Sequence, residues 1–491
     1  MRYLRPGFIL LASCFFLNSF SQTKPSAITA IREGDIKKDL YEMASDHFRG
    51  REAGTLDELK AATWLAEKAK AAGFLPAGDD GTFFQFFPLI RSRIMPNSTI
   101  KIGDRSFDLW QNVLISQIAP ANISAPVVFI GKGKYDDPGN IDIKGKAVAI
   151  EVSKDDISLD ISLPNRRYLG YVSRKYAVNL VAKGAAAIIF ISDEIADDSW
   201  AENIPYITRG LYDIEGGPSA NVQAKPPYIW LHKDELEFIK TSGLVLTANL
   251  NVETFEYPSV NVVGKILGTD PKLKKENVLF SGHIDHDGIR MAEGGDSIYN
   301  GADDNASACV ALLAIGRAFK KLPGKRSALF VWHGSEERGL LGSKWFALRP
   351  TVPKSSIVAV LNADMIARNH PDSAALLGSQ PPHLNSKALV KMAMEANNEG
   401  PKFKLDTLWD KPEHPETFYF RSDHLPYARE GIPSIFYTTM LHPEYHTPMD
   451  EASHIDYKKL LKMTQWMYRT GWKVANANVK PALERNFNLE R

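Results

Sequence analysis

Five short polar segments of this 491-residue sequence carry side chains that could do chemistry. Each lies at the edge of an apolar run, and together they supply two histidines and at least four carboxylates. In chain order they are His283-Ile284-Asp285, Asp303-Asp304-Asn305, Glu336-Glu337, Asn362-Ala363-Asp364 and Tyr445-His446. Gathered in one cleft, so many carboxylates would repel one another and their pKa values would rise. A pair of divalent cations removes that repulsion, because zinc binds both imidazole nitrogen and carboxylate oxygen.

The set of possible ligands fits a two-metal hydrolytic site. Two ions about 3.5–4 Å apart can share one carboxylate and one water molecule, which is an arrangement used for hydrolysis. Each ion then needs about two further ligands, and two histidines, one aspartate and one glutamate meet that requirement. The residues therefore indicate a two-zinc hydrolase.

Near-continuous apolar strands alternate with amphipathic helices from Pro258 onward, and this alternation positions the five segments. The predicted strands are residues 277–281, 327–332, 357–361 and 434–437, and the predicted helices are residues 306–322, 342–347, 386–397, 424–430 and 457–473. This pattern is typical of an α/β fold with a mostly parallel mixed sheet flanked by helices. In such sheets ligands gather at the carboxyl ends of the strands, where the polar segments lie.

Residues 97–250 have a different, β-rich character, with short apolar runs such as 125–130 and 147–152. Residues 143–148 (Ile-Lys-Gly-Lys-Ala-Val) and 183–190 resemble the protease-associated domain, a β-rich module inserted into exported peptidases and receptors. The expected domain order is a signal peptide at 1–21, a first peptidase segment at 22–96, the inserted domain at 97–250, the main peptidase segment at 251–475 and a tail at 476–491.

The first 21 residues have the layout of a secretory signal peptide. Arg2 and Arg5 precede the apolar run 8–17, and small serine residues suit cleavage after Ser21. The run is too short to cross a bilayer, and no later run reaches the roughly 18 apolar residues that a transmembrane helix needs. A lipoprotein leader, with a lipid attached to Cys14, is the alternative. We therefore expect an exported protein, periplasmic or extracellular, without a transmembrane segment.

Composition and missing motifs exclude several other classes of protein. With 59 basic and 58 acidic residues the formal charge is +1, which argues against a polybasic nucleic-acid or membrane-surface protein. Once the leader is removed only Cys309 remains, so an intrachain disulfide and a cysteine metal site are excluded. The sequence lacks a Walker A loop, a dinucleotide fingerprint, a His-Glu-x-x-His motif and a Gly-x-Ser-x-Gly elbow. Kinase, dehydrogenase, zincin and serine hydrolase functions therefore lack support.

With their flanking residues, the polar segments resemble metallopeptidase family 28, which comprises co-catalytic zinc aminopeptidases and carboxypeptidases. Six motifs occur in the order of that family, at residues 281–285, 300–307, 335–343, 361–365, 421–424 and 445–450. A further stretch, residues 48–55 (Phe-Arg-Gly-Arg-Glu-Ala-Gly-Thr), extends the resemblance to nearly the whole mature chain. An α/β zinc exopeptidase fold with an inserted protease-associated domain is the implied architecture.

The resemblance implies a complete set of ligands for two Zn²⁺ per chain. These are His283 and Asp364 for one zinc, Glu337 and His446 for the other, and Asp304 as the bridge between them. Asp304 is preferred to Asp303 because it precedes Asn305, where the family has a strained and often cis peptide bond. Asp285 would accept the remaining N–H of His283 and so fix the tautomer of that ring.

The same resemblance implies roles in catalysis. Glu336 is the expected general base: its neighbour Glu337 is a ligand, and adjacent side chains diverge. It would take a proton from a water molecule between the metals and pass it to the leaving amine. Tyr445 would hydrogen-bond the oxyanion, and Arg421 is a secondary candidate for contact with a substrate carboxylate. Nearby residues interpreted as lining or structural are His286, Asp287, His333, His424 and His442.

These residues together predict an exported zinc-dependent exopeptidase that acts on peptides and binds no nucleic acid. An aminopeptidase, which removes N-terminal residues, is favoured over a carboxypeptidase. One alternative is a one-zinc glutaminyl cyclase, but cyclases have tryptophan before the last histidine ligand, where this chain has Tyr445. The other is a receptor-like binding protein, but such relatives lose metal ligands that are all present here. The side-chain preference is expected to depend on residues 406–420, and the oligomeric state stays open.

Overall fold

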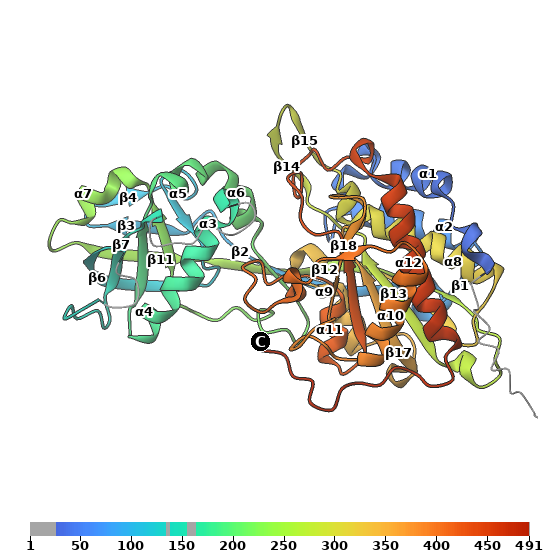
Figure 1. Cartoon of the computed structure of the whole chain (residues 1–491). Coiled ribbons are helices and arrows are strands. Elements are labelled where there is room, and N and C mark those ends of the chain that lie inside the picture. The colour runs from blue at the N-terminus through green and yellow to red at the C-terminus, as the bar shows by residue number, and fades with distance from the viewer. Residues whose placement is uncertain (1–25, 134–137, 155–163, 491) are drawn as a thin grey trace, which may run out of the picture.

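The computed structural model of the chain describes residues 26–133, 138–154 and 164–490. Within these ranges no helix is both long and apolar enough to cross a bilayer. The predicted leader, with Cys14, lies outside the described residues. Two lobes make up the described chain, each built around its own large sheet (Figure 1). All five polar segments lie in the lobe with the larger sheet.

The larger sheet has ten strands and a parallel centre. Its order is β19 (Lys404–Leu405), β18 (Ser373–Leu377), β20 (Ser434–Thr438), β17 (Ile357–Ala363), β13 (Asn277–His283), β16 (Ser327–His333), β12 (Val252–Ile266), β2 (Phe84–Ile94) and β9 (Leu211–Ile214), with β1 (Leu75–Pro76) beside β12. β20, β17, β13 and β16 pair in parallel, whereas β18 joins β20, and β12 joins β16, in antiparallel fashion. The predicted α/β class with a mixed sheet is confirmed, and the parallel block is the part that carries the site.

The central strands are apolar throughout because both faces of the sheet are covered. Successive residues of a strand point to opposite faces, so Val278 and Phe280 of β13 pack into one core and Leu279 into the other. The first core contains α1 (Glu33–Met43), α2 (Leu56–Ala71), α8 (Ala308–Lys321), α10 (Lys387–Glu399) and α12 (Tyr457–Asn476), and the second contains α9 (Leu341–Leu348) and α11 (His424–Arg429). The five helices predicted after Pro258 are present, with ends shifted by up to three residues.

Strand register aligns the carboxyl ends of the parallel block. His283 at the end of β13 lies opposite His333 at the end of β16, and Ser281 lies opposite Asn362 of β17. Asn362 in turn lies opposite Phe436 of β20. The loops that follow these four strands therefore begin at one edge of the sheet.

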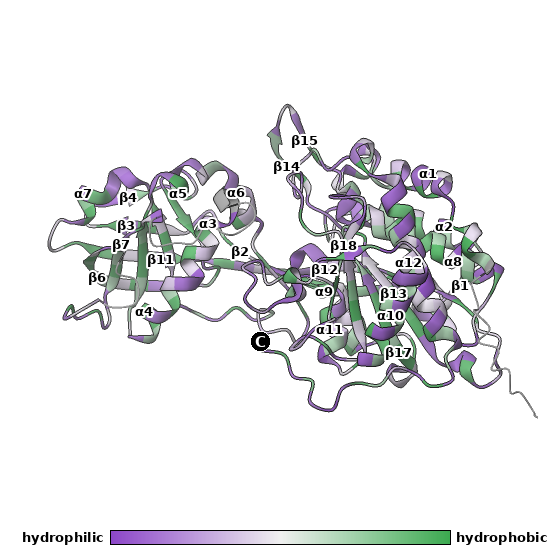
Figure 2. Cartoon of the chain, in the orientation of Figure 1, coloured by the Kyte–Doolittle hydropathy of each residue, from purple (hydrophilic) through white to green (hydrophobic). Residues whose placement is uncertain are grey.

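The smaller sheet lies within the segment predicted to be inserted. Its order is β4 (Arg105–Phe107), β3 (Thr99–Ile102), β11 (Val245–Leu250), β6 (Ala121–Lys132), β7 (Ala147–Glu151), β8 (Ala187–Ile191), β10 (Tyr228–Leu231) and β5 (Val113–Ile115). Two cores of its own cover its faces, with Val148 and Ile150 in one and Ala147 and Ala149 in the other. Figure 2 shows hydrophobic residues concentrated in the strands of both lobes. Separate cores support an inserted domain at 97–250, an assignment that we keep as a proposal.

One strand of this segment returns to the larger sheet. β9 follows α6 (Trp200–Arg209) and pairs with β2 in antiparallel fashion. The sequence analysis named no strand at these residues. Burial stabilises it: Ile214 is fully buried and packs with Leu89 and Leu341. The inserted segment is thus joined to the lobe with the larger sheet by a strand as well as by its two ends.

Candidate metal centre

Five loops at the carboxyl edge of the parallel block converge on one position. His283 ends β13, Glu337 lies in the turn after β16, and Asp364 follows β17. Asp304 lies in the turn before α8, and His446 lies between β20 and α12. All five predicted ligands fall into two clusters, in each of which the donor atoms lie within 4.8 Å of one another. The spatial convergence on which the ligand prediction depends is therefore present.

The first cluster consists of His283, Asp304 and Asp364. Nε2 of His283 lies 3.2 Å from Oδ1 of Asp304 and 3.5 Å from Oδ1 of Asp364. Ser422 donates a hydrogen bond of 2.8 Å to the other oxygen of Asp364, which leaves Oδ1 directed at His283. Three protein donors of this kind leave one position of a zinc ion free for water or substrate.

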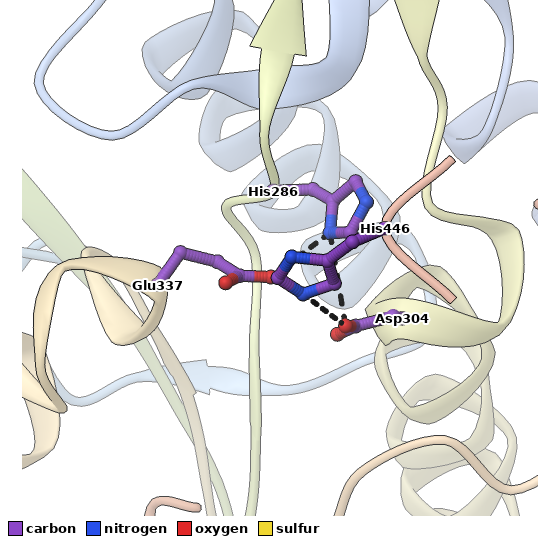
Figure 3. Close-up of side chains that lie close together, drawn as sticks. All are labelled: His286, Asp304, Glu337 and His446. Atoms are coloured by element: carbon purple, nitrogen blue, oxygen red, sulfur yellow. Dashed lines mark hydrogen bonds and ion pairs between the residues drawn. The ribbon is translucent and has the colours of Figure 1, made fainter. Parts of the chain in front are cut away.

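The second cluster consists of His286, Asp304, Glu337 and His446 (Figure 3). Nε2 of His446 lies 3.1 Å from Oδ2 of Asp304 and 3.1 Å from Oε1 of Glu337. Nδ1 of His286 lies 3.0 Å from the same oxygen of Glu337. The sequence analysis interpreted His286 as a lining or structural residue, and the structure places its ring within the cluster. The sequence contained one indication of this position: His286 follows the predicted ligand His283 by three residues in the same loop.

Asp304 belongs to both clusters and offers one carboxylate oxygen to each. Oδ1 faces His283 and Oδ2 faces His446. A carboxylate shared in this way, with imidazole nitrogens and further carboxylates around it, is the donor set that a pair of zinc ions requires. The residues present therefore fit the metal pair that the family implies.

The electrostatics of the clusters favour positive charge at their centre. Burial alone would lower the pKa of His283, but the nearby carboxylates, Glu336 first, raise it well above its ordinary value. Burial opposes charge on His446 too, and Glu337 raises the pKa of that ring well above its ordinary value. Burial would raise the pKa of Asp304, but its contacts with the two histidines lower it. Bound divalent cations would supply the charge that this arrangement stabilises.

The turn that carries Asp304 is held by neighbouring loops. The peptide bond between Asp304 and Asn305 is cis, which confirms the expectation from the family resemblance. Asp450 accepts hydrogen bonds of 3.0 Å from the backbone N–H groups of Asp303 and Asp304. The side chain of Asn305 donates to the carbonyl of Ala363 at 3.0 Å, next to Asp364. These bonds fix the shared carboxylate relative to the end of β17.

Asp285 supports the site differently from the prediction. Nδ1 of His283 lies 3.0 Å from the backbone carbonyl of Asp285, while the carboxylate is 3.9 Å away. The carboxylate instead accepts the backbone N–H groups of Glu336 at 2.9 Å and Glu337 at 3.2 Å. The main chain of Asp285 thus orients His283, and its side chain positions the two glutamates.

Glu336 lies beside both clusters and belongs to neither. Its Oε2 is 4.0 Å from Nε2 of His283, and the residue is buried. Burial raises the pKa of Glu336 well above its ordinary value, and the carboxylates of Asp364 and Glu337 add to the effect. A carboxylate in such surroundings can accept a proton and return it near neutral pH.

Tyr445 and Arg421 are linked by hydrogen bonds to the inserted segment. Nη2 of Arg421 donates to the phenolic oxygen of Tyr445 at 3.0 Å. The buried carboxylate of Glu416 accepts from Arg421 at 2.6 Å and from Arg167, in α3 (Pro164–Val172), at 2.5 Å. Burial raises the pKa of Tyr445, so the phenol keeps its proton. Glu416 lies in the segment 406–420 that was expected to affect side-chain preference, but nothing in the sequence places Arg167 beside it.

Among the polar residues interpreted as structural, Asp287 contacts a predicted ligand. Its Oδ2 lies 3.0 Å from Nδ1 of His446. Arg290 donates to Asp287 at 2.9 Å, and Arg209 at the end of α6 donates at 3.4 Å. Asp287 is therefore placed to orient His446. The other three histidines interpreted as lining or structural lie outside both clusters. His333 contacts Asn261 and Tyr427, His424 stacks on Phe436, and His442 lies near Asp303.

Arg51, in the stretch 48–55, forms hydrogen bonds with the loops that carry residues of the second cluster. It is fully buried and donates to the carbonyls of Ile284 at 2.7 Å, Asn300 at 2.7 Å and Gly301 at 3.0 Å. One guanidinium thus satisfies carbonyl groups of two loops that carry His286 and Asp304. Its planar fork of donors suits this task, and a lysine could not replace it.

Changing Arg51 to methionine should lower the free energy of unfolding by at least about 3 kcal/mol, because several buried carbonyls lose a charged donor. Urea denaturation would measure the effect. Arg49→Met is the matched control: Arg49 is more than half exposed, and its Nε is 3.4 Å from Asp57. The free energy of unfolding of Arg49→Met should stay within about 0.5 kcal/mol of the wild-type value. Equal effects of the two substitutions would contradict the role given to Arg51.

Comparison with known proteins agrees with this geometry. Residues 261–470 match the family model described as peptidase family M28. A relative from Bacillus subtilis (strain 168), named aminopeptidase YwaD, is 24% identical over 348 residues, covering 69% of this chain; the match spans 64% of the relative's length. The solved aminopeptidase from Aneurinibacillus sp. strain AM-1 has a TM-score of 0.57 at 18% identity and covers 92% of this chain and 95% of its own.

A second solved structure, titled BSAP, a zinc aminopeptidase from Bacillus subtilis, has a TM-score of 0.57 at 19% identity. The alignment covers 93% of this chain and 99% of that one. At these identities the structural likeness shows the fold, and it extends over both lobes. The family match covers the segment that holds all the histidines and carboxylates of the two clusters. Residues 261–470, which hold both clusters, match peptidase family M28.

Proposed function

We propose that the chain is a zinc-dependent exopeptidase, and specifically an aminopeptidase that removes N-terminal residues from peptides. The observation that carries this proposal is the pair of histidine–carboxylate clusters that share Asp304, with Glu336 beside them outside both ligand sets. The names of the relatives, aminopeptidase and zinc aminopeptidase, support the same reaction and the same metal.

His283 and Asp364 would hold one Zn²⁺, Glu337 and His446 the other, and Asp304 would hold both. When bound, zinc supplies Lewis acidity that polarises the scissile carbonyl and makes water a nucleophile near neutral pH. Asp285 and Asp287 keep the glutamates and His446 in position through the contacts described above. The chain's own contribution is thus to fix the ligand atoms before the metals bind.

Glu336 would move the proton. A carboxylate oxygen of Glu336 accepts a proton from the attacking water and then gives it to the nitrogen of the departing amine. Tyr445 would donate its phenolic hydrogen to the oxyanion. Because Arg421 already donates to the phenolic oxygen, the hydrogen of that group stays available for the substrate. Arg421, held also by Glu416, thus positions Tyr445, in place of the substrate contact expected from the sequence.

A substrate panel combined with metal removal tests the function. Aminoacyl substrates with a free amino terminus should be cleaved, and the same substrates with a blocked amino terminus should not. A chelator should abolish hydrolysis, and Zn²⁺ should restore it. Preference for blocked substrates would overturn the choice of aminopeptidase. Full activity of metal-free protein would exclude the metal mechanism, and cyclisation of N-terminal glutamine without hydrolysis would favour a cyclase.

We also propose that the protein is exported, by means of the basic and apolar leader at residues 1–21. The peptidase domain would consist of residues 22–96 and 251–475, with an inserted protease-associated domain between them. The separate cores of the smaller sheet support that division. Through Arg167 and Arg209 the inserted segment contacts residues next to both Tyr445 and His446.

A further inference from the structure

His286 faces the same two carboxylate oxygens as His446. Its Nδ1 lies 3.0 Å from Oε1 of Glu337 and 3.9 Å from Oδ2 of Asp304, while Nε2 of His446 lies 3.1 Å from each of these oxygens. The two rings are nearly perpendicular, at 82°, with centroids 5.1 Å apart. Two nitrogens and two oxygens therefore approach one position from different sides (Figure 3).

The separations fit one tetrahedral zinc ion. With bonds of about 2.0–2.2 Å, the ligand atoms of such an ion lie about 3.3–3.6 Å apart. The distances from the two nitrogens to the two oxygens run from 3.0 to 3.9 Å, on both sides of that value. Movements of a few tenths of an ångström would bring all four atoms into ligand positions.

The fold fixes the ring of His286 and leaves room for it. Its backbone N–H donates to the carbonyl of Arg51 at 3.2 Å, and the residue is fully buried. Gly301 packs directly against the imidazole, since a Cβ at that position would lie 2.5 Å from two of the ring atoms. A side chain at 301 would displace the ring from the carboxylates. The histidine is therefore held in place without any help from a bound ion.

We propose that His286 is a fourth protein ligand of the zinc at the second cluster, so that the two metal positions are unequal. This inference rests on the zinc binding of the proposed function and deepens it. The first cluster offers three protein donors and keeps one position of its zinc open for water or substrate. At the second cluster, four protein donors would occupy all four positions of a tetrahedral zinc. Sites with four protein ligands are typical of zinc that a protein holds permanently. Zinc then binds first at the position of His446 and is lost from it last. Zinc at the position of His283 exchanges more readily with the solvent.

The test counts imidazoles around zinc and does not depend on turnover. Metal-free full-length protein is loaded with one equivalent of Zn²⁺, and zinc X-ray absorption reports the ligands. The expected result is about two imidazoles per zinc in the wild type and about one in His286→Ala. Titration against a chromophoric chelator should show the tighter of two affinities weakened by about 10–100-fold or more in the variant.

His383→Ala is the matched control, because His383 is also buried but contacts Asp410 and Glu490, outside both clusters. It should keep the wild-type ligand count and both affinities. One imidazole per zinc in the wild type would overturn the proposal and would leave His286 as a residue that only orients Glu337 by a hydrogen bond. The wild-type count decides even if the variant fails to fold. Protein that binds no zinc at all would overturn the proposed function itself.

Discussion

Replacing Glu336 by glutamine should leave zinc bound and remove almost all peptide hydrolysis. An amide can neither accept the proton of the attacking water nor return one to the leaving amine. General acid–base catalysis contributes about 10²–10⁴-fold, and we expect kcat to fall by that factor. KM should change little, because the lost proton transfer acts in the transition state. Steady-state kinetics on an unblocked aminoacyl substrate would measure both constants.

The fold around this substitution should be preserved. The backbone N–H of Glu336 is held by the carboxylate of Asp285, an interaction that does not involve the side chain being changed. Glutamine has the same shape as glutamate, so the turn after β16 keeps its packing. A lower rate in Glu336→Gln would then report the missing proton acceptor and not a displaced loop.

The adjacent glutamate provides a control with the same chemical change. Oε1 of Glu337 lies 3.1 Å from Nε2 of His446, so Glu337→Gln should lose zinc as well as activity. Elemental analysis of the purified variants separates the two cases. Near-normal hydrolysis by Glu336→Gln would refute its role in proton transfer. Loss of zinc from that variant would instead place Glu336 among the ligands.

The parallel block and the convergence of the loops were predictable because local sequence determines both. Strands such as residues 327–333 are apolar at every position, which is the pattern of a strand covered on both faces. Once the strands are parallel, their carboxyl ends share an edge, and residues as far apart as His283 and His446 must meet there. The position of each loop therefore followed from its place after a strand, without any knowledge of packing.

Contacts between distant segments were not predictable, because no local pattern encodes them. β9 is four residues long, and it is stabilised by pairing with β2 and by burial of Ile214. Arg51 lies in a stretch whose resemblance was noted, but its hydrogen bonds go to backbone carbonyls, which leave no mark on the sequence. The same reason explains Asp285, whose carboxylate binds backbone N–H groups in place of the histidine ring.

The surroundings of the buried histidines were not predictable for a related reason. The sequence does not show which side chains a histidine near a metal loop will contact. His333 and His286 are both fully buried, yet the first lies between Asn261 and Tyr427 and the second between carboxylates. The neighbours of each ring, which for His286 include Gly301, distinguish the two.

Asp304→Asn should abolish the paired zinc site. Only Asp304 offers an oxygen to each cluster among the described residues, and an asparagine has one oxygen in place of two. The change also removes a negative charge that two dications would share. We expect at most one zinc per chain and hydrolysis reduced to the level of metal-free protein.

A binding measurement separates this loss from a loss of fold. A ligand at 100 times its Kd stabilises the native state by about 2.7 kcal/mol, so zinc should raise the Tm of the wild type clearly and that of Asp304→Asn much less. Asp303→Asn is the neighbouring control. Burial raises the pKa of Asp303 well above its ordinary value, and its Oδ1 accepts the N–H of Ala367 at 2.8 Å. An amide keeps that acceptor, so Asp303→Asn should retain the full zinc response. If Asp304→Asn kept two zinc ions per chain while Asp303→Asn lost them, the bridging carboxylate would be Asp303.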